Sequence, residues 1–494
     1  MKLKAIICCV SLIFLFISCS ESDDSDSNEP NPTGTASFGA STSSTVSTRS
    51  ITITGQISSE GGSPVTERGV VWSTNQNPTT SDNKEPAGSG MGSFTAAISN
   101  LEPNTSYNFR LYAINGQGTA YDSQITLSTL EEVENVFIGD VTLNSQSEVD
   151  LFAAQQYTGI TGSLFIFETQ PILSLSPLSS LTFVNENLVI QNASRLVNLD
   201  GLENIAGSVS NLQIQNLPRL EDISSLSNLD GVLQFLLLEE LPFMTHFDAL
   251  SGLEINKGFL LIRNNERLER LPSLLYTNAM YYIDLIDNPF LTDISGLNGV
   301  EKINELVIKE NDALTSLDAI TSLQSINQLE IESNSNLTSL FNSSFITEMD
   351  ELTILGNEKL TDVSGLNNLT IVRGHLTIDQ NNSLPQINLS SLQVVVGQTK
   401  IRLNHSLTNL NGLSSLERLE DQSIISNNKA LTSVDGLENL RFVRNGLLFI
   451  QDNVVLSDFC ALRPFVDKGQ GLFQISGNLF NPRREEIAKG NCSL

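Results

Sequence analysis

The five cysteines have the clearest chemistry in this sequence, and they fall into two groups. Cys8, Cys9 and Cys19 lie at the start of the chain, and Cys460 and Cys492 lie near its end. No cysteine lies between these groups, so the body of the chain has no cysteine-based metal motif. In an exported protein, two cysteines that flank the final segment favour a disulfide that fixes the C-terminal cap, with a free reactive thiol as the alternative.

Catalytic residue types are present but scattered. The spacing of His246, His375 and His405 indicates neither a metal site nor a general base. The chain has no glycine-rich phosphate loop and no nucleophile motif. Carboxylates such as Glu332 and Asp379 occupy positions that we expect to face solvent. We therefore predict no catalytic residues, no metal ligands, no cofactor and no enzymatic activity.

The first 19 residues are typical of an export signal. Lys2 and Lys4 precede the apolar run 5–17, which is too short to span a membrane as a helix. This run ends in Leu15-Phe16-Ile17-Ser18-Cys19, which resembles the lipobox of bacterial lipoproteins, although Phe16 stands where that family usually has Leu. The resemblance implies cleavage after Ser18 and lipidation of Cys19.

An acidic tract, residues 20–26, follows Cys19 directly. It resembles the signal that sends lipoproteins of the Bacteroidota to the outer face of the outer membrane. We predict a lipoprotein signal peptide at 1–18, a flexible acidic tether at 19–35, and an exported outer-membrane lipoprotein that faces the cell exterior. The alternative is an ordinary signal peptide followed by a disordered linker.

The chain is strongly acidic. Its 494 residues include 27 Lys and Arg and 56 Asp and Glu, so the net charge is −29. This balance argues against nucleic acid and anionic membrane surfaces as partners, because both require a basic surface. Solubility is the simplest reason for the acidity, and capture of cations is the alternative.

Residues 36–130 read as a β-sandwich of about seven strands, because short β-rich runs alternate with Gly, Pro and Asn turns. The stretch 101–107, Leu-Glu-Pro-Asn-Thr-Ser-Tyr, resembles the fibronectin type III signature. That resemblance implies that Tyr107 hydrogen-bonds back to the backbone as a tyrosine corner. Trp72 departs from the family, since it falls in the third strand and not the second. The unit is a spacer or, less often in such proteins, a ligand module.

Most of the remaining chain repeats every 23 or 24 residues. Each turn has an apolar residue at offset 0, another at +2, and further apolar residues at +8, +11 and +14. The alternation predicts one strand per turn, stacked into a parallel sheet of about fourteen turns. The offset-0 residues are Leu164, Leu188, Leu212, Leu236, Leu260, Ile283, Leu306, Leu329, Leu352, Leu376, about Ile401 (with Leu403 at +2), about Ser423, Leu448 and about Phe473.

Asparagine also follows the repeat. Most turns from the fifth onward have Asn at +5, namely Asn265, Asn288, Asn311, Asn334, Asn357, Asn381, Asn428 and Asn453. We interpret this column as an internal ladder in which each amide bonds the backbone of a bend, where Asn also tolerates left-handed geometry. A polar binding stripe is the alternative.

The repeat resembles the receptor L domain, a right-handed, leucine-rich, β-helix-like fold of growth-factor receptors. The stretches 357–366 and 374–378 carry the likeness. The receptors' cysteine-rich modules are missing, which weakens any inference to hormone binding. We predict an all-β protein: a sandwich at 36–130, a linker and cap at 131–163 with a helix at 147–155 and Ser147 near its N-cap, a right-handed parallel solenoid at 164–459, and a C-terminal cap at 460–494.

One group of apolar residues occupies offsets that we expect to point outward. These predicted binding candidates are Phe235, Leu237, Phe259, Leu261, Tyr282 and Ile286, beside Tyr281. Exposed apolar patches usually mark interaction sites, and aromatic side chains on a sheet face suit proteins or sugar rings. Stacking that stabilises the sheet, or cover by a loop or the N-terminal unit, would also explain them.

The sequence thus favours a monomeric, non-enzymatic surface protein that binds an unidentified protein or glycan through its solenoid. The first alternative is a structural adhesin or spacer without a defined small ligand. The second is a polysaccharide-active β-helix enzyme, which would need a groove of converging carboxylates that the repeat does not provide.

Overall fold

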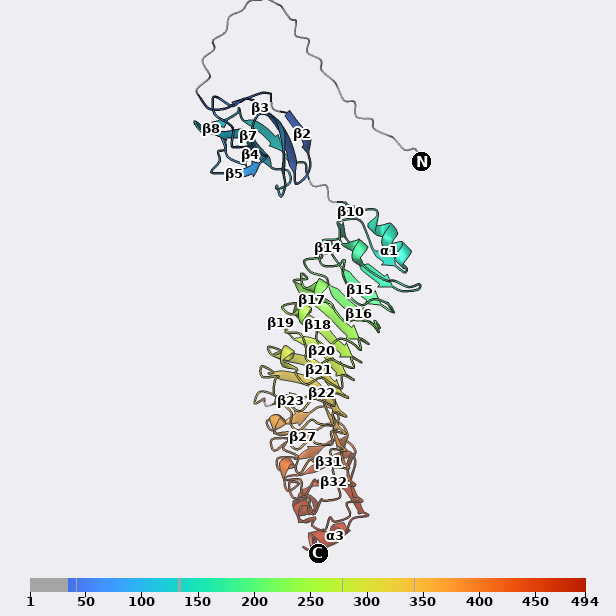
Figure 1. Ribbon diagram of the computed structural model, residues 1–494. Coiled ribbons are helices and arrows are strands. Elements are labelled where there is room, and N and C mark those ends of the chain that lie inside the picture. The colour runs from blue at the N-terminus through green and yellow to red at the C-terminus, as the bar shows by residue number, and fades with distance from the viewer. Residues whose placement is uncertain (1–33, 41, 132–134, 278, 342) are drawn as a thin grey trace, which may run out of the picture. The chain divides into compact units, whose positions relative to one another are not determined.

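A computed structural model describes residues 34–131, 135–277, 279–341 and 343–494, apart from position 41. The chain divides near position 133 into two compact units. Figure 1 shows a small N-terminal sandwich and a long unit of stacked coils. The predicted export signal, Cys19 and residues 19–33 of the predicted tether lie outside the described residues.

The N-terminal unit is a sandwich of two antiparallel sheets. One sheet joins β1 (Ser37–Phe38), β2 (Thr42–Val46), β3 (Ile51–Ser59) and β6 (Gly92–Ile98). The other joins β4 (Glu67–Ser73), β5 (Asn83–Pro86), β7 (Ser106–Asn115), β8 (Gly118–Tyr121) and β9 (Ile125–Ser128). Alternate residues of facing strands, such as Ile53, Phe94 and Phe109, form the buried core.

Tyr107 lies at the start of β7 and is 9% exposed. Its hydroxyl oxygen accepts a hydrogen bond from the backbone N–H of Glu102 at 3.0 Å. This is the corner that the sequence predicts, and it fixes the loop that enters β7. Trp72 lies half-buried on β4, next to Phe109 in the β4–β7 pairing.

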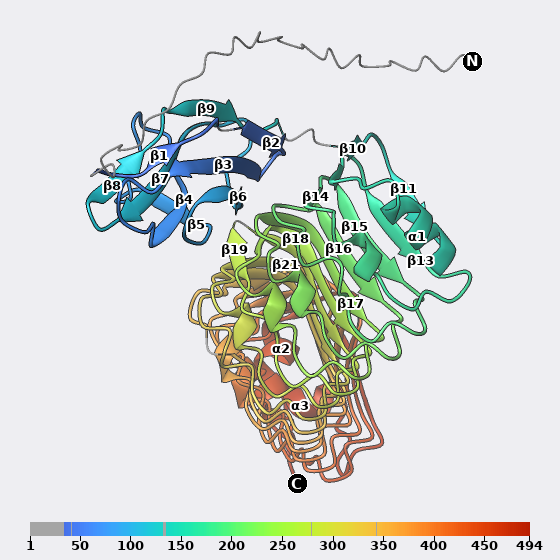
Figure 2. The same ribbon diagram turned by 45° about the horizontal axis from the view of Figure 1, so that its top comes forward.

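The C-terminal unit is a parallel β solenoid built on one sheet of 20 strands. Each coil contributes one principal strand: β11 (Val141–Leu143), β13 (Leu164–Phe167), β15 (Asn187–Gln191), β16 (Asn211–Gln215), β17 (Val232–Glu239), β18 (Glu254–Arg263), β20 (Met280–Ile286), β21 (Lys302–Lys309), β22 (Ser325–Glu332), β24 (Glu351–Leu355), β26 (Leu376–Asp379), β28 (Thr399–Arg402), β30 (Ser423–Ser426), β31 (Phe442–Gln451) and β32 (Gln470–Ser476). The view in Figure 2 looks obliquely along this stack.

Shorter elements complete the coils. Short strands precede some principal strands: β10 (Val136–Phe137), β12 (Gly159–Ile160), β14 (Phe183–Val184), β19 (Leu275–Thr277), β23 (Glu348–Met349), β25 (Ile371–Val372), β27 (Val394–Val395) and β29 (Arg418–Leu419). Single 3-10 turns follow several of the principal strands: η1 (Ser176–Leu178), η2 (Ser224–Leu226), η3 (Asp248–Leu250), η4 (Ser295–Leu297), η5 (Ser364–Leu366), η6 (Asn411–Leu413) and η7 (Cys460–Leu462).

The repeat positions fill the interior as the sequence predicts. In the coil of Leu352, the residues at +2, +8, +11 and +14 are all 0% exposed: Ile354, Leu360, Val363 and Leu366. One coil cannot bury these side chains alone, so each depends on its two neighbours for a complete apolar environment.

The register of one late coil differs from the sequence prediction. Leu376 pairs with Thr399, and Ile378 pairs with Ile401, so offset 0 is Thr399 and not Ile401. The predicted +2 residue, Leu403, instead lies in the bend after the strand, with φ of 54°. The repeat pattern predicts apolar residues at both offset 0 and +2, but in this coil offset 0 is a buried threonine.

The asparagine column is an internal ladder, and it is longer than predicted. The corrected register places Asn404 at +5, and Asn478 occupies the same position in the last coil. From Asn265 to Asn453 each ladder side chain is 0% exposed. The side-chain amide of Asn334, for example, donates to the backbone oxygen of Ile308 at 2.9 Å.

The left-handed residue of each bend is the one before the ladder asparagine. Positive φ recurs at +4 in residues as different as Glu310, Ser333 and Gln380. None of the ladder asparagines itself has a positive φ. Their role is to hydrogen-bond the bend, and the preceding residue makes the turn.

Both ends of the solenoid are capped. Helix α1 (Gln146–Ala153) begins after Ser145, whose side chain accepts from the N–H of Glu148, so the N-cap is Ser145 and not Ser147. Strand β11 pairs with β13, and β32 pairs with β31, so the parallel sheet extends on both sides of the segment 164–459. Helices α2 (Arg463–Lys468) and α3 (Arg484–Ala488) flank β32 at the C-terminal end.

Candidate functional site

The predicted outward residues lie on adjacent strands of the solenoid sheet. Phe235 pairs with Phe259, and Phe259 pairs with Tyr282 in the next coil. These strands are placed by buried neighbours, such as Leu236 and Leu260, which point into the coil. Alternation along each strand therefore directs the aromatic residues outward.

Three rings form a continuous ring cluster, which we define as Phe235, Phe259 and Tyr281. The centroids of Phe235 and Phe259 are 6.2 Å apart, and those of Phe259 and Tyr281 are 5.7 Å apart. Phe259 is 41% exposed and Tyr281 is 50% exposed. Two large rings in contact with each other thus remain accessible on one rigid sheet.

The other predicted candidates are less accessible. Leu237 is only 8% exposed, so its selection as a contact residue is not supported by its burial. It lies at the central outward position of β17, paired with Gln213 on one side and Leu261 on the other. Three further candidates are half-buried at the edge of the ring cluster: Leu261, Tyr282 and Ile286.

Asp284 occupies the central outward column next to Leu261, and the sequence analysis did not single it out. Its side chain is 0% exposed. Its Oδ2 accepts from Nε of Arg263 at 2.9 Å, and the Arg263 guanidinium also bonds it through a second nitrogen. Burial raises the pKa of Asp284, while Arg263 opposes that rise. This charged pair interrupts the row of apolar residues that Leu237 and Leu261 form on the adjacent strands.

The surface changes character on either side of the ring cluster. The two preceding coils present amides at the outward offsets: Asn187, Gln191, Asn211, Gln213 and Gln215. The following coils present acids: Glu305, Glu330, Glu332 and Glu351. Burial, and then the charge of Glu330, raise the pKa of Glu305. Lys309 bonds both Glu330 and Glu332 within this acidic area.

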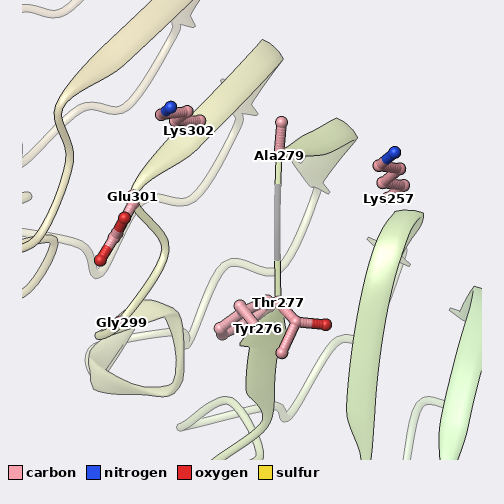
Figure 3. A pocket seen from close by; sticks show the side chains of 7 residues that line it. All are labelled: Lys257, Tyr276, Thr277, Ala279, Gly299, Glu301 and Lys302. Carbon is pink, nitrogen blue, oxygen red and sulfur yellow. The ribbon is translucent and has the colours of Figure 1, made fainter.

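A hollow lies around the first residues of β18 and β21 and the segment before β20. Its volume is about 540 Å³, and it is lined by Lys257, Tyr276, Thr277, Ala279, Gly299, Glu301 and Lys302 (Figure 3). The hydroxyl of Tyr276 donates to the backbone oxygen of Gly296 at 2.9 Å, and Thr277 bonds Glu254. The sequence gives no signal for this hollow, because its residues lie at offsets that carry no hydrophobic period.

The histidines do not converge. His246 Nδ1 lies 3.4 Å from Asp248 Oδ2, and Arg270 pairs with the same carboxylate. His375 Nδ1 accepts from the N–H of Gln398, and burial lowers the pKa of His405. Among the described residues, no group of three or more His, Cys, Asp or Glu side chains is placed to hold a metal ion.

The structure tests the prediction for one group of cysteines and not for the other. Cys460 and Cys492 form a disulfide across a separation of 32 residues. Cys19, the predicted lipidation site, lies outside the described residues. Within the described part of the chain, no helix is long and apolar enough to span a membrane.

Comparison with known protein families supports the interpretation of the sandwich. A family model described as the fibronectin type III domain matches residues 39–129. With the corner at Tyr107, this match makes the N-terminal unit a fibronectin type III domain. A search of curated proteins gives no match to the chain.

Proposed function

We propose that this protein is a non-enzymatic recognition protein of the cell surface, and that its solenoid binds a protein or glycan through the ring cluster. The observation that carries the proposal is the contact between Phe259 and Tyr281, whose rings are both substantially exposed. Large aromatic side chains contribute strongly to binding, and a rigid sheet that holds their backbone in place lowers the entropic cost of binding. The likeness of the repeat to receptor L domains favours the same class of function.

The test compares two substitutions of equal chemistry in the same region. Phe259→Ser combined with Tyr281→Ser is expected to reduce binding of ligands captured on glycan and protein arrays at least tenfold, because both exposed rings are lost. The control is Phe290→Ser, since Phe290 is 62% exposed in the coil of Tyr281 but lies beyond the sheet face. Binding is measured by surface plasmon resonance with the full-length protein in detergent.

The unfolding midpoints of both variants should stay close to that of the wild type, which separates lost contacts from lost structure. Equal binding by the double variant and the wild type would contradict the proposal. Arrays without any specific ligand would favour the alternative, a structural adhesin or spacer built from the same solenoid.

The position proposed for the protein is the outer face of the outer membrane, with a lipid anchor on Cys19. The support for this is the sequence Leu15–Cys19 and the acidic tract that follows it. Cys19→Ser is expected to abolish incorporation of radiolabelled palmitate in cells, because the thiol that accepts the lipid is gone. Cys9→Ser is the control, since Cys9 would be removed with the signal peptide. Labelling of the Cys19→Ser variant would contradict a lipid anchor at this residue.

A further inference from the structure

On two coils, residues that line the hollow stand close in sequence to residues of the ring cluster. Lys257 precedes Phe259 by two residues, and Ala279 precedes Tyr281 by two residues. Because parallel strands stack about 4.8 Å apart, the backbones of Lys257 and Lys302 lie about two strand spacings apart. Figure 3 shows the two lysines on either side of Ala279, with Glu301 pointing away from them.

The two lysines differ from the basic residues around them. Arg263 is paired with Asp284, Lys309 with Glu330, and Arg270 with Asp248. Among the described residues, neither Lys257 nor Lys302 has an ion-pair partner. In a chain of net charge −29, the hollow thus carries two lysines against one acidic lining residue, Glu301.

We infer that the combined surface binds an acidic glycan, with a sugar carboxylate between Lys257 and Lys302 and a neighbouring sugar ring on Tyr281 and Phe259. This inference rests on the proposed function. Ammonium groups form charge-assisted hydrogen bonds with a carboxylate, which are stronger than neutral ones. Flat, accessible rings suit the apolar face of a sugar ring. An aliphatic side chain of a protein partner would instead gain its free energy of binding from deep burial, which this open surface does not offer.

The overall charge limits the size of the ligand. The net charge of −29 repels long polyanions, whereas screening over about 8 Å at physiological ionic strength leaves a short contact with the two lysines intact. The surface therefore fits a short or sparsely charged acidic glycan, such as an oligosaccharide with one or a few uronic or sialic acid units.

The experiment uses matched pairs of ligands. Isothermal titration calorimetry with the full-length protein in detergent compares trigalacturonate, a hyaluronan tetrasaccharide and sialyllactose, each with its own methyl ester. At least one acid is expected to bind at least tenfold more tightly than its ester, because the ester keeps the sugar rings and removes the charge.

Variants then separate the two halves of the surface. Lys257→Gln with Lys302→Gln should weaken binding of that acid at least tenfold, to the level of its ester, and leave ester binding unchanged. Lys400→Gln with Lys429→Gln is the matched control and should change nothing. Phe259→Ser with Tyr281→Ser should weaken the acid and the ester together.

The contrary outcomes are distinct. Equal affinity for acid and ester, or tighter binding of a glutamate-rich peptide than of any acidic sugar, would overturn the inference and leave recognition by the ring cluster standing. The inference would also be overturned, with recognition by the ring cluster still standing, if no glycan binds but a protein ligand binds the wild type and not the ring variants. If no ligand depends on the rings, the proposed function fails as well.

Discussion

Replacing Asn334 by alanine is expected to lower the free energy of unfolding of the solenoid by about 3–5 kcal/mol. The Oδ1 atom of Asn334 accepts from the backbone N–H of Asn311 at 3.1 Å. Its Nδ2 donates to the backbone oxygen of Ile308 and to Oδ1 of Asn357. The alanine variant leaves several of these buried groups without a partner, and each costs about 1–3 kcal/mol.

Urea unfolding followed by circular dichroism measures this effect. The control is Asn327→Ala, because the amide of Asn327 makes only an exposed hydrogen bond to Asn304. That variant should lose less than about 0.5 kcal/mol, as surface substitutions usually do. Equal losses in the two variants would show that the buried ladder does not stabilise the coil in this way.

Removing the disulfide is expected to destabilise the C-terminal cap by about 3–4 kcal/mol, the loss of loop-closure entropy for a loop of this length. The bond between Cys460 and Cys492 closes a separation of 32 residues. It holds the end of the chain beside the last coil, where the N–H of Phe459 donates to the oxygen of Cys492 at 2.8 Å. Ile487, from α3, is buried in the same cap.

Hydrogen–deuterium exchange of the backbone amides in residues 460–494 tests this prediction. The variant with both Cys460→Ser and Cys492→Ser should exchange faster there than the oxidised wild type. Reductant should bring the wild type to the rate of the variant, and should leave the variant itself unchanged. A cap whose amides stay protected in both conditions would show that packing alone is sufficient.

The periodic part of the fold was predictable because one physical rule repeats in every coil. Residues at offset 0 and +2 must point into the same interior, so Leu352 and Ile354 identify a strand from sequence alone. The rule failed at Thr399, because the apolar residues Ile401 and Leu403 fit the same pattern two residues later in the chain. Asn404 fixes the true register, since a ladder asparagine must stand five residues after offset 0.

The candidate site was predictable only in part. Alternation along a strand predicts which side chains point outward, but their exposure also depends on the side chains around them. Leu237 is therefore buried while Phe259 is exposed, although both point outward. Tyr281 contacts Phe259 from the second position of β20, which strict alternation with Tyr282 does not place on the sheet face. Lys257 and Lys302 come together only because non-adjacent coils stack, and no local sequence signal reports that proximity.

The asparagine ladder also has a direction, and this bears on how such a chain changes its length. Each ladder residue donates its backbone N–H to Oδ1 of the asparagine in the next coil and accepts at its own Oδ1 from the previous coil, while its Nδ2 also donates to a backbone oxygen of the previous coil. This pattern runs from Asn265 to Asn478, where Asn481 accepts the last bonds. Any two interior coils therefore present the same join. Duplication or loss of a whole coil between these ends would restore the ladder bonds, so the reach of this protein is adjustable in steps of one repeat.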